Sequence, residues 1–332
     1  MRGSDTFRRL LTALACAALA TSGVAACGDD DEDGGGQQPA ADRPVKLRIG
    51  ETVGVPFAFL KFGVDKGFYE EVGLDVEPVG IQGAAPIVTG IVSGDYEMGG
   101  SDTGTFTQAL ARDLPLTMIT PGTSVSEQPK QDFSALMVSP ESGIDDPEDL
   151  RGKTVAANVL GNITEGSLNG ALMQLGVDFK AVQYTEVPFP EMVAAVQKGQ
   201  VDGAFIIEPF RTIGEAAGLE TLFGPFSTFE PGLQIGSIIT TERYAEQNPE
   251  VISRFQEAHA RTARYIAENE AEFRGALPEI SEIKAPLARQ VNLPVWQEKV
   301  DPDSVERVAE AMEQQGLVDE APDVRAAIHE GA

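Results

Sequence analysis

Residues 199–210 have the sequence Gly-Gln-Val-Asp-Gly-Ala-Phe-Ile-Ile-Glu-Pro-Phe, a glycine turn followed by a short apolar run that ends at Glu208 and Pro209. The proline cannot donate to a strand ladder, so the run predicts a buried strand with a polar rim. Residues 94–104 show the same pattern as Gly-Asp-Tyr-Glu-Met-Gly-Gly-Ser-Asp-Thr-Gly. An offset of 105 aligns Ile87 with Met192, Val88 with Val193, Ile91 with Val196, Gly94 with Gly199 and Glu97 with Asp202. The chain therefore contains one structural unit twice.

Strand and helix patterns alternate along both copies of this unit. The first copy predicts strands at 45–49, 74–79, 96–100 and 116–119 and helices at 57–72, 86–92 and 103–112. The second predicts strands at 153–157, 181–184 and 201–207 and helices at 164–175 and 190–198. Such alternation predicts mostly parallel sheets with helices on their faces.

Two further apolar segments, 133–138 and 233–239, do not belong to either repeat and are expected to cross between two lobes. The remaining chain is helical, with predicted helices at 249–269, 270–277, 285–291 and 303–315 that return to the first lobe. The predicted class is a two-lobed α/β fold with two crossing hinge segments. Its first lobe comprises residues 45–135 and 238–332, and its second comprises residues 136–237.

The N-terminus has the features of an export signal. Arg2, Arg8 and Arg9 precede an apolar run at 10–20 that is too short to span a bilayer. Val-Ala-Ala-Cys at 24–27, followed by Gly28, resembles the bacterial lipobox, in which cleavage before the cysteine is followed by its acylation. We expect a signal peptide at 1–26, a lipidated Cys27 and an acidic, glycine-rich tether at 27–44. An ordinary signal cleaved near Ala26 is the alternative.

Composition excludes several classes of function. The chain of 332 residues carries a net charge of −27, which would repel nucleic acid and anionic membrane surfaces. Its only cysteines are Cys16 and Cys27, so the processed chain lacks disulfides and thiolate metal sites. His259 and His329 lie in the helical C-terminal part, and no metal-ligand cluster or nucleophile motif is visible. We therefore expect no metal, no cofactor and no catalytic residues.

Candidate ligand-binding residues lie where strands end and helices begin, because open α/β sheets bind ligands at the carboxyl ends of their strands. Ser101, Asp102, Thr103 and Thr164 are equally explained as helix caps, although a helix N-terminus can serve both roles. The full predicted set is Thr52, Val53, Pro56, Phe57, Ser101, Asp102, Thr103, Asn158, Asn162, Ile163, Thr164, Glu208 and Phe210.

Glu208 has two possible kinds of partner. A carboxylate at the end of an apolar strand is costly to desolvate without a donor, so either a ligand amine or a neighbouring N–H group is expected to meet it. Phe57, Phe189 and Phe210 could stack on a ligand ring or pack against their own lobe.

Several segments together resemble the nitrate, taurine, aliphatic-sulfonate and thiamine-pyrimidine family of ABC-transporter substrate-binding proteins. They are Phe-Gly-Val-Asp-Lys-Gly-Phe-Tyr-Glu-Glu-Val-Gly-Leu-Asp-Val at 62–76, Ser-Gly-Asp-Tyr-Glu-Met at 93–98, Asp-Leu-Arg-Gly-Lys-Thr-Val at 149–155, Gly-Gln-Val-Asp-Gly at 199–203 and Glu208-Pro209. The resemblance runs from about residue 46 to 330. It implies a type II periplasmic-binding-protein-like fold that closes on a small molecule and delivers it to an ABC permease.

Three functions remain open at this stage. A monomeric, membrane-anchored, extracytoplasmic transport receptor is favoured. An enzyme is disfavoured, because a related pyrimidine-synthesising branch uses a cysteine-rich motif that this chain lacks. A ligand sensor for a membrane partner would share the same domain. The rim loops contain Asp102 and Glu208 and no Lys or Arg, with Arg211 just beyond, which favours a neutral or amine-bearing ligand such as an aromatic heterocycle over sulfonate, taurine or nitrate.

Overall fold

The computed structural model describes residues 44–281 and 283–332. The predicted signal peptide, Cys27 and nearly all of the predicted tether lie outside the described residues. Within the described part, no helix combines the length and the apolar character needed to cross a membrane.

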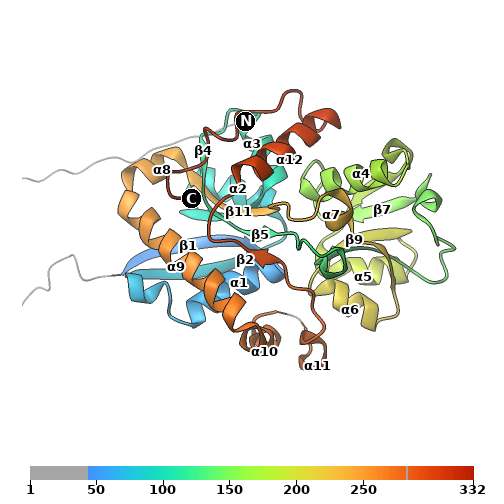
Figure 1. Ribbon diagram of the computed structural model, residues 1–332, viewed down its shortest axis with the longest axis horizontal. Helices are drawn as coiled ribbons and strands as arrows, with labels where there is room; N and C mark the ends of the chain where they lie inside the picture. The colour runs from blue at the N-terminus through green and yellow to red at the C-terminus, as the bar shows by residue number, and fades with distance from the viewer. Residues whose placement is uncertain (1–43, 282) are drawn as a thin grey trace, which may run out of the picture. The chain divides into compact units, whose positions relative to one another are not determined.

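The first sheet has the strand order β2-β1-β3-β11-β4. Its strands β1, β2, β4 and β11 are labelled in Figure 1. Its strands are β1 (Val45–Thr52), β2 (Leu74–Ile81), β3 (Met98–Asp102), β4 (Leu116–Pro121) and β11 (Gly236–Thr241). β1 pairs in parallel with β2 and β3, whereas β11 runs antiparallel to β3 and β4. The carboxyl ends of β1 and β3 therefore meet at one edge of the sheet.

The helices of this half connect and cover the sheet. They are α1 (Val55–Asp65), α2 (Ala84–Ser93), α3 (Thr103–Leu110), α8 (Glu242–Gln247) and α9 (Pro249–Glu268). α1 is shorter than predicted, since Gly67 and Gly73 adopt left-handed φ values of 77° and 76° on either side of a single 3-10 turn, Glu70–Val72. These glycines end the helix and turn the chain into β2.

The second sheet has the order β10-β6-β9-β7-β8. Its strands are β6 (Ser134–Val138), β7 (Thr154–Ala157), β8 (Gln183–Glu186), β9 (Gly203–Ile207) and β10 (Glu220–Phe223), and its helices are α4 (Ile163–Gln174), α5 (Phe189–Gln197), α6 (Phe210–Ala216) and α7 (Pro225–Phe229). β7 pairs in parallel with β8 and β9, and β6 runs antiparallel to β9 and β10. This arrangement reproduces that of the first sheet.

The internal repeat is thus confirmed at the level of topology. α2 and α5 begin at Ala84 and Phe189, and β3 and β9 begin at Met98 and Gly203, so each pair is separated by 105 residues. The segments expected to cross between lobes supply β6 and β11, the antiparallel strand of each sheet. Along the chain, the change of sheet falls between Pro121 and Ser134 and again between Phe223 and Gly236.

The remaining elements bring the C-terminal part back across both halves. They are β5 (Thr123–Ser124), which pairs with β12 (Val295–Trp296), the helices α10 (Glu270–Ile280), α11 (Ala285–Ala288) and α12 (Pro302–Gln314), and the 3-10 helices Pro129–Gln131, Pro147–Leu150 and Phe179–Ala181. α12 packs against both α3 and α4.

Three apolar clusters form the cores. One face of the first sheet packs on α1 and α9 through residues such as Leu60 and Phe255, and its other face packs on α2, α3 and α12 through Ile87 and Phe106. The third cluster fills the second half and continues to Phe273 of α10. Burial of apolar surface stabilises the folded chain by about 25 cal/mol per Å². These cores therefore fix the positions of the loops at the strand ends.

Candidate ligand-binding site

A cavity of about 70 Å³ lies where the carboxyl ends of β1, β3 and β9 meet the starts of α4 and α5. This is the position at which α/β sheets of this kind bind ligands. Residues from both halves line it: Glu51, Thr52, Pro56, Ser101, Asp102, Gly122, Thr123, Phe133, Asn158, Asn162, Ile163, Thr164, Phe189, Ile207, Phe226, Ile235, Gly236 and Ser237.

The structure brings most of the predicted site residues to this cavity, namely Thr52, Pro56, Ser101, Asp102, Asn158, Asn162, Ile163 and Thr164. Their common property is a position within a few residues of a strand end. The predicted residues Val53, Phe57, Thr103, Glu208 and Phe210 are not among the lining residues, and each has other contacts.

Asp102 caps one helix and contacts another. Its carboxylate accepts hydrogen bonds from the Thr105 N–H (2.7 Å) and hydroxyl (2.7 Å) at the start of α3. It also accepts one from the Ile163 N–H (3.1 Å), the first residue of α4 in the second half. Burial raises the pKa of Asp102 above its usual value, and these donors oppose the rise. Asp102 therefore links the two halves at the edge of the cavity.

The start of α4 is occupied by side chains of the protein. Asn162 Oδ1 accepts from the N–H groups of Thr164 (2.9 Å) and Glu165 (3.5 Å), and Asp102 takes the N–H of Ile163. Asn158 Oδ1 accepts from the Thr164 hydroxyl (2.8 Å). A helix N-terminus binds an anion through such N–H groups, so this terminus is already capped.

The two halves approach each other closely beside these caps. A Cβ atom on Gly104 of α3 would lie 2.4 Å from the Ile163 backbone nitrogen and 2.9 Å from the Asn162 carbonyl carbon. Only glycine permits this approach without backbone movement. The close approach at Gly104 and the Asp102–Ile163 hydrogen bond therefore keep the two halves in contact beside the cavity.

Apart from Glu208, the predicted residues that do not line the cavity pack next to its rim. They are Thr103, Val53, Phe57 and Phe210. Thr103 is fully buried, and its N–H and hydroxyl both donate to the Ile235 carbonyl (2.8 and 3.2 Å). Val53 and Phe57 pack over Gly80 of β2. Phe210 lies 6.4 Å from Phe189, centroid to centroid, with the rings nearly parallel at 12°. Phe189 is the member of that pair that reaches the cavity.

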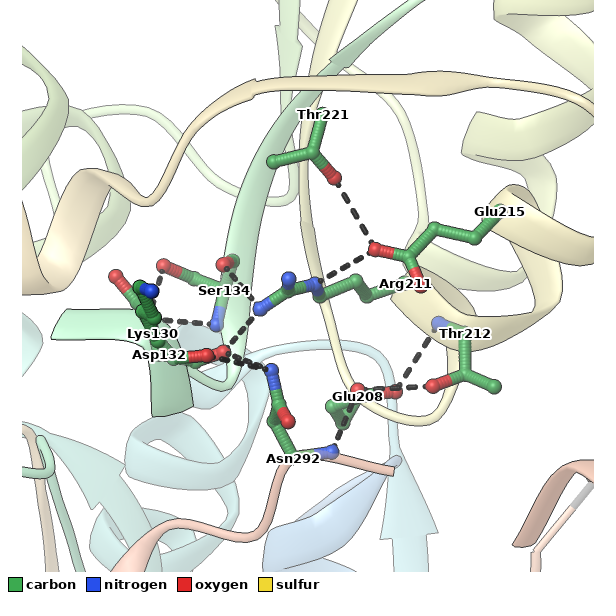
Figure 2. Close-up of polar contacts among 9 residues, drawn as sticks. All are labelled: Lys130, Asp132, Ser134, Glu208, Arg211, Thr212, Glu215, Thr221 and Asn292. Carbon is green, nitrogen blue, oxygen red and sulfur yellow. Dashed lines mark hydrogen bonds and ion pairs between the residues drawn. The ribbon is translucent and has the colours of Figure 1, made fainter. Parts of the chain in front are cut away.

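Glu208 meets donors of the protein itself (Figure 2). Its oxygens accept from the Thr212 N–H (3.1 Å), the Thr212 hydroxyl (2.9 Å) and the Asn292 N–H (2.8 Å). The side chain is 1% exposed, and burial raises its pKa to about 7. Figure 2 also shows that Arg211 bonds to the carbonyl groups of Asp132 and Ser134 and pairs with Glu215. Of the two partners expected for Glu208, the structure supplies neighbouring N–H groups.

Glu51 is a cavity residue that the sequence analysis did not select. It is 6% exposed, and its Oε1 accepts the Thr52 N–H at 2.7 Å. Burial raises its pKa to about 8. The residue precedes the loop that the strand-end rule selects, and the only signal for it was an acidic residue after the apolar positions Ile49 and Gly50.

Several apolar lining residues were also missed. Phe133 and Ile235 belong to the expected crossing segments, Phe226 lies in α7 of the second half, and all three are buried. In sequence they are indistinguishable from core residues, because the same side chains satisfy both roles. None of the described residues that line the cavity is Lys, Arg or His, and residues 44–281 and 283–332 contain no His, Cys, Asp and Glu cluster able to hold a metal ion.

Comparison with known families identifies the family of the chain. A family model described as NMT1/THI5 like matches residues 56–272, more than half of the chain. The chain belongs to the NMT1/THI5-like family. The family suspected from the segments at 62–76 and 199–203 is thereby confirmed.

Curated relatives of this NMT1/THI5-like protein are binding proteins. It is 27% identical to the taurine-binding periplasmic protein of Escherichia coli (strain K12) over 192 residues, which cover 58% of this chain and 57% of that protein. The match thus spans less than two thirds of that relative. It is 25% identical to the formylaminopyrimidine-binding protein of Halalkalibacterium halodurans over 260 residues, or 77% of this chain and 73% of the relative.

The fold of the NMT1/THI5-like protein is shared with solved binding proteins. The periplasmic aliphatic sulphonate binding protein SsuA from Escherichia coli superimposes with a TM-score of 0.69 at 20% identity, covering 86% of this chain and 97% of that one. The predicted periplasmic-binding-protein-like α/β fold is therefore confirmed.

Proposed function

We propose that the protein is the extracytoplasmic substrate-binding component of an ABC importer, which captures a small molecule between its two halves and delivers it to a membrane permease. The observation that carries this proposal is the cavity itself, lined by strand ends of both sheets and bordered by the Asp102–Ile163 contact. A ligand in this position touches both halves only when they are closed, so binding favours the closed state.

The proposed ligand is a small neutral or amine-bearing molecule. The ionisable residues on the cavity wall are Glu51 and Asp102, both acidic, and the N-terminus of α4 is already capped by Asp102 and Asn162. Sulfonate or nitrate would need positive charge or free N–H donors in their place. One relative is named for formylaminopyrimidine, a nitrogen heterocycle with N–H groups, whereas taurine, for which another is named, carries both an amine and a sulfonate and so favours neither ligand class.

Binding without catalysis is the proposed activity. The relatives are named as binding proteins. His259 is buried beside Phe59, Phe255 and Tyr69, its Nε2 lies 2.9 Å from the Pro121 carbonyl oxygen, and burial lowers its pKa to about 4. These contacts explain His259 as a core residue.

Thermal-shift screening combined with small-angle X-ray scattering tests the proposal. A ligand at a concentration of 100 times its Kd stabilises the folded protein by about 2.7 kcal/mol, which a melting curve detects. The radius of gyration should then fall when the confirmed ligand is added. If a ligand binds and the radius is unchanged, capture by closure is contradicted.

A further inference from the structure

We propose that Glu51 is a ligand-contacting residue that selects molecules carrying an N–H-bearing nitrogen, which donates a hydrogen bond to its second carboxyl oxygen. The inference rests on the proposed function and names the ligand chemistry of the same site. The sequence-based preference for an amine-bearing ligand depended on Asp102 and Glu208, whereas the structure points to a different carboxyl group.

The three carboxyl groups differ in their unused bonding capacity. Asp102 accepts hydrogen bonds from three donors, and so does Glu208. Glu51 accepts one, from the Thr52 N–H to Oε1, and its Oε2 has no partner among the described residues. Oε2 is not one of the fully buried polar atoms that lack a partner, so it is open to the cavity, where the ionised carboxyl group can accept a hydrogen bond from a ligand donor.

Glycine at position 100 makes room for this carboxyl group. A Cβ atom on Gly100 of β3 would lie 2.0 Å from Glu51 Oε1 and 2.4 Å from Oε2. The carboxyl group of Glu51 therefore lies directly over the backbone of the neighbouring strand β3, on the wall of the cavity. Glu51 can therefore contact a ligand there without moving.

The surrounding polar groups also present acceptors. The Ser101 hydroxyl donates to the Asp102 carbonyl (3.0 Å), and the Ser237 hydroxyl donates to the Ser101 carbonyl (3.2 Å). Both hydroxyl protons are thus used within the protein, and the free lone pairs of the two oxygens remain. Glu51 and these two hydroxyl oxygens are all acceptors on the cavity wall, so a ligand nitrogen with several N–H groups has more than one acceptor to meet.

The size of the cavity restricts the ligand further. At about 70 Å³ it is smaller than the pockets of roughly 300–1,000 Å³ that enclose drug-sized ligands. Pro56, Phe133 and Phe226 add apolar surface to the cavity wall. The ligand class is therefore a small primary amine or amino-heterocycle with a compact apolar or neutral remainder.

Calorimetry on the purified protein with matched pairs of probes tests this inference. The pairs are propylamine and propanol, aminopyrimidine and pyrimidine, and taurine and isethionate, with nitrate as an anion that lacks N–H groups. At pH 9, where a carboxyl group with a pKa of about 8 is mostly ionised, the amino compound of at least one pair should bind about ten- to a hundredfold more tightly than its partner, the usual range for a charge-assisted hydrogen bond. The pair that responds distinguishes an alkylamine from an amino-heterocycle and from an aminosulfonate.

Glu51→Gln and Glu208→Gln form a matched set of variants. Glu51→Gln should abolish the preference for the amino compound and keep or raise the melting temperature of the ligand-free protein. Glu208→Gln, which alters a buried carboxyl group away from the cavity, should lower the melting temperature and keep the preference. An unchanged preference in Glu51→Gln, or tighter binding of the members without N–H groups, would overturn the inference and leave the proposed function standing. If neither these probes nor a wider panel of small solutes binds, both the inference and the proposed function are contradicted.

Discussion

At the residue scale, neighbouring buried carboxyl groups have separate roles that follow from their donors. Glu208 is surrounded by Thr212 and Asn292, and Glu51 faces the cavity with one oxygen bonded. The sequence predicts that a carboxylate at the end of an apolar strand needs a donor. Which donor it meets depends on Asn292, which is 84 residues further along the chain, so the partner was not predictable from the local pattern.

Replacing Glu208 should affect folding more than binding. In Glu208→Gln one carboxylate oxygen becomes an NH₂ group that faces an N–H donor, so we expect a loss of about 1–3 kcal/mol in the free energy of unfolding. Thermal unfolding at pH 8, where the carboxyl group is ionised, measures this loss. Ligand affinity should stay within about twofold, because Glu208 does not line the cavity. A large change in affinity with an unchanged melting temperature would instead place Glu208 in contact with the ligand.

The pH dependence of stability follows from the same groups. The pKa is raised from 4.5 to about 8 in Glu51 and to about 7 in Glu208, so the folded protein retains protons that the unfolded chain has released. Their contribution to stability is therefore complete below pH 4.5 and lost as pH rises. Burial also raises the pKa of Asp102. His259 acts in the opposite direction, but only between its lowered pKa of about 4 and 6.5.

Above pH 6.5 the ligand-free protein should lose stability with rising pH, by up to about 1.4 kcal/mol per pH unit for each titrating group. Melting temperatures between pH 6.5 and 8 measure this slope, and Glu51→Gln should reduce it. A slope that is the same in Glu51→Gln and in the unchanged protein would show that Glu51 does not titrate in this range.

At the element scale, segments with a clear apolar pattern were predicted well, and several short elements were not. Helices α9 and α12 and strands β1 and β9 have apolar patterns long enough to identify them. The one- and two-turn helices α6, α7 and α8 and the edge strand β10 were not predicted, because so few residues show no period. Likewise the strand-end rule found the loops around Ser101 and Asn162, but not Glu51, which precedes its loop.

The close approach of α3 and α4 gives a prediction at this scale. In Gly104→Ala the added Cβ would meet backbone atoms of Asn162 and Ile163, which cannot rotate away. We expect closure to be hindered and ligand affinity to fall by about tenfold, or 1.4 kcal/mol, while the ligand-free melting temperature is kept, since alanine favours helix. Calorimetry and scattering measure the two effects.

Gly275→Ala in α10 is the matched control, because no atom lies within 4 Å of the added Cβ there. It should bind ligand like the unchanged protein. If Gly104→Ala also binds with unchanged affinity, contact between α3 and α4 plays no part in ligand capture.

At the scale of the whole molecule, the repeat and the family resemblance predicted the fold, whereas the ligand depends on contacts between distant segments. Phe133 and Ser237 reach the cavity because β6 follows the first repeat unit but pairs within the second sheet, and β11 follows the second unit but pairs within the first sheet. No pattern within either unit indicates that these residues meet. The fold was therefore predictable, and the composition of the cavity wall only in part.

Membrane anchoring is a prediction that concerns the chain outside the described residues. The lipobox at 24–27 and the acidic tether after it predict acylation of Cys27, and stable anchoring requires more than one lipid chain. Cys27→Ala should release the protein from the membrane fraction of its native host, as fractionation and immunoblotting would show. Recovery of the unchanged protein in the soluble fraction would contradict anchoring.

A crystal structure of the protein with its confirmed ligand tests capture between the two halves most directly. We predict ligand density in the cavity, with contacts to Glu51 and Ser101 from the first half and to Asn158 or Phe189 from the second. Density on the outer surface, or contacts confined to the residues of one sheet, would contradict capture between the halves.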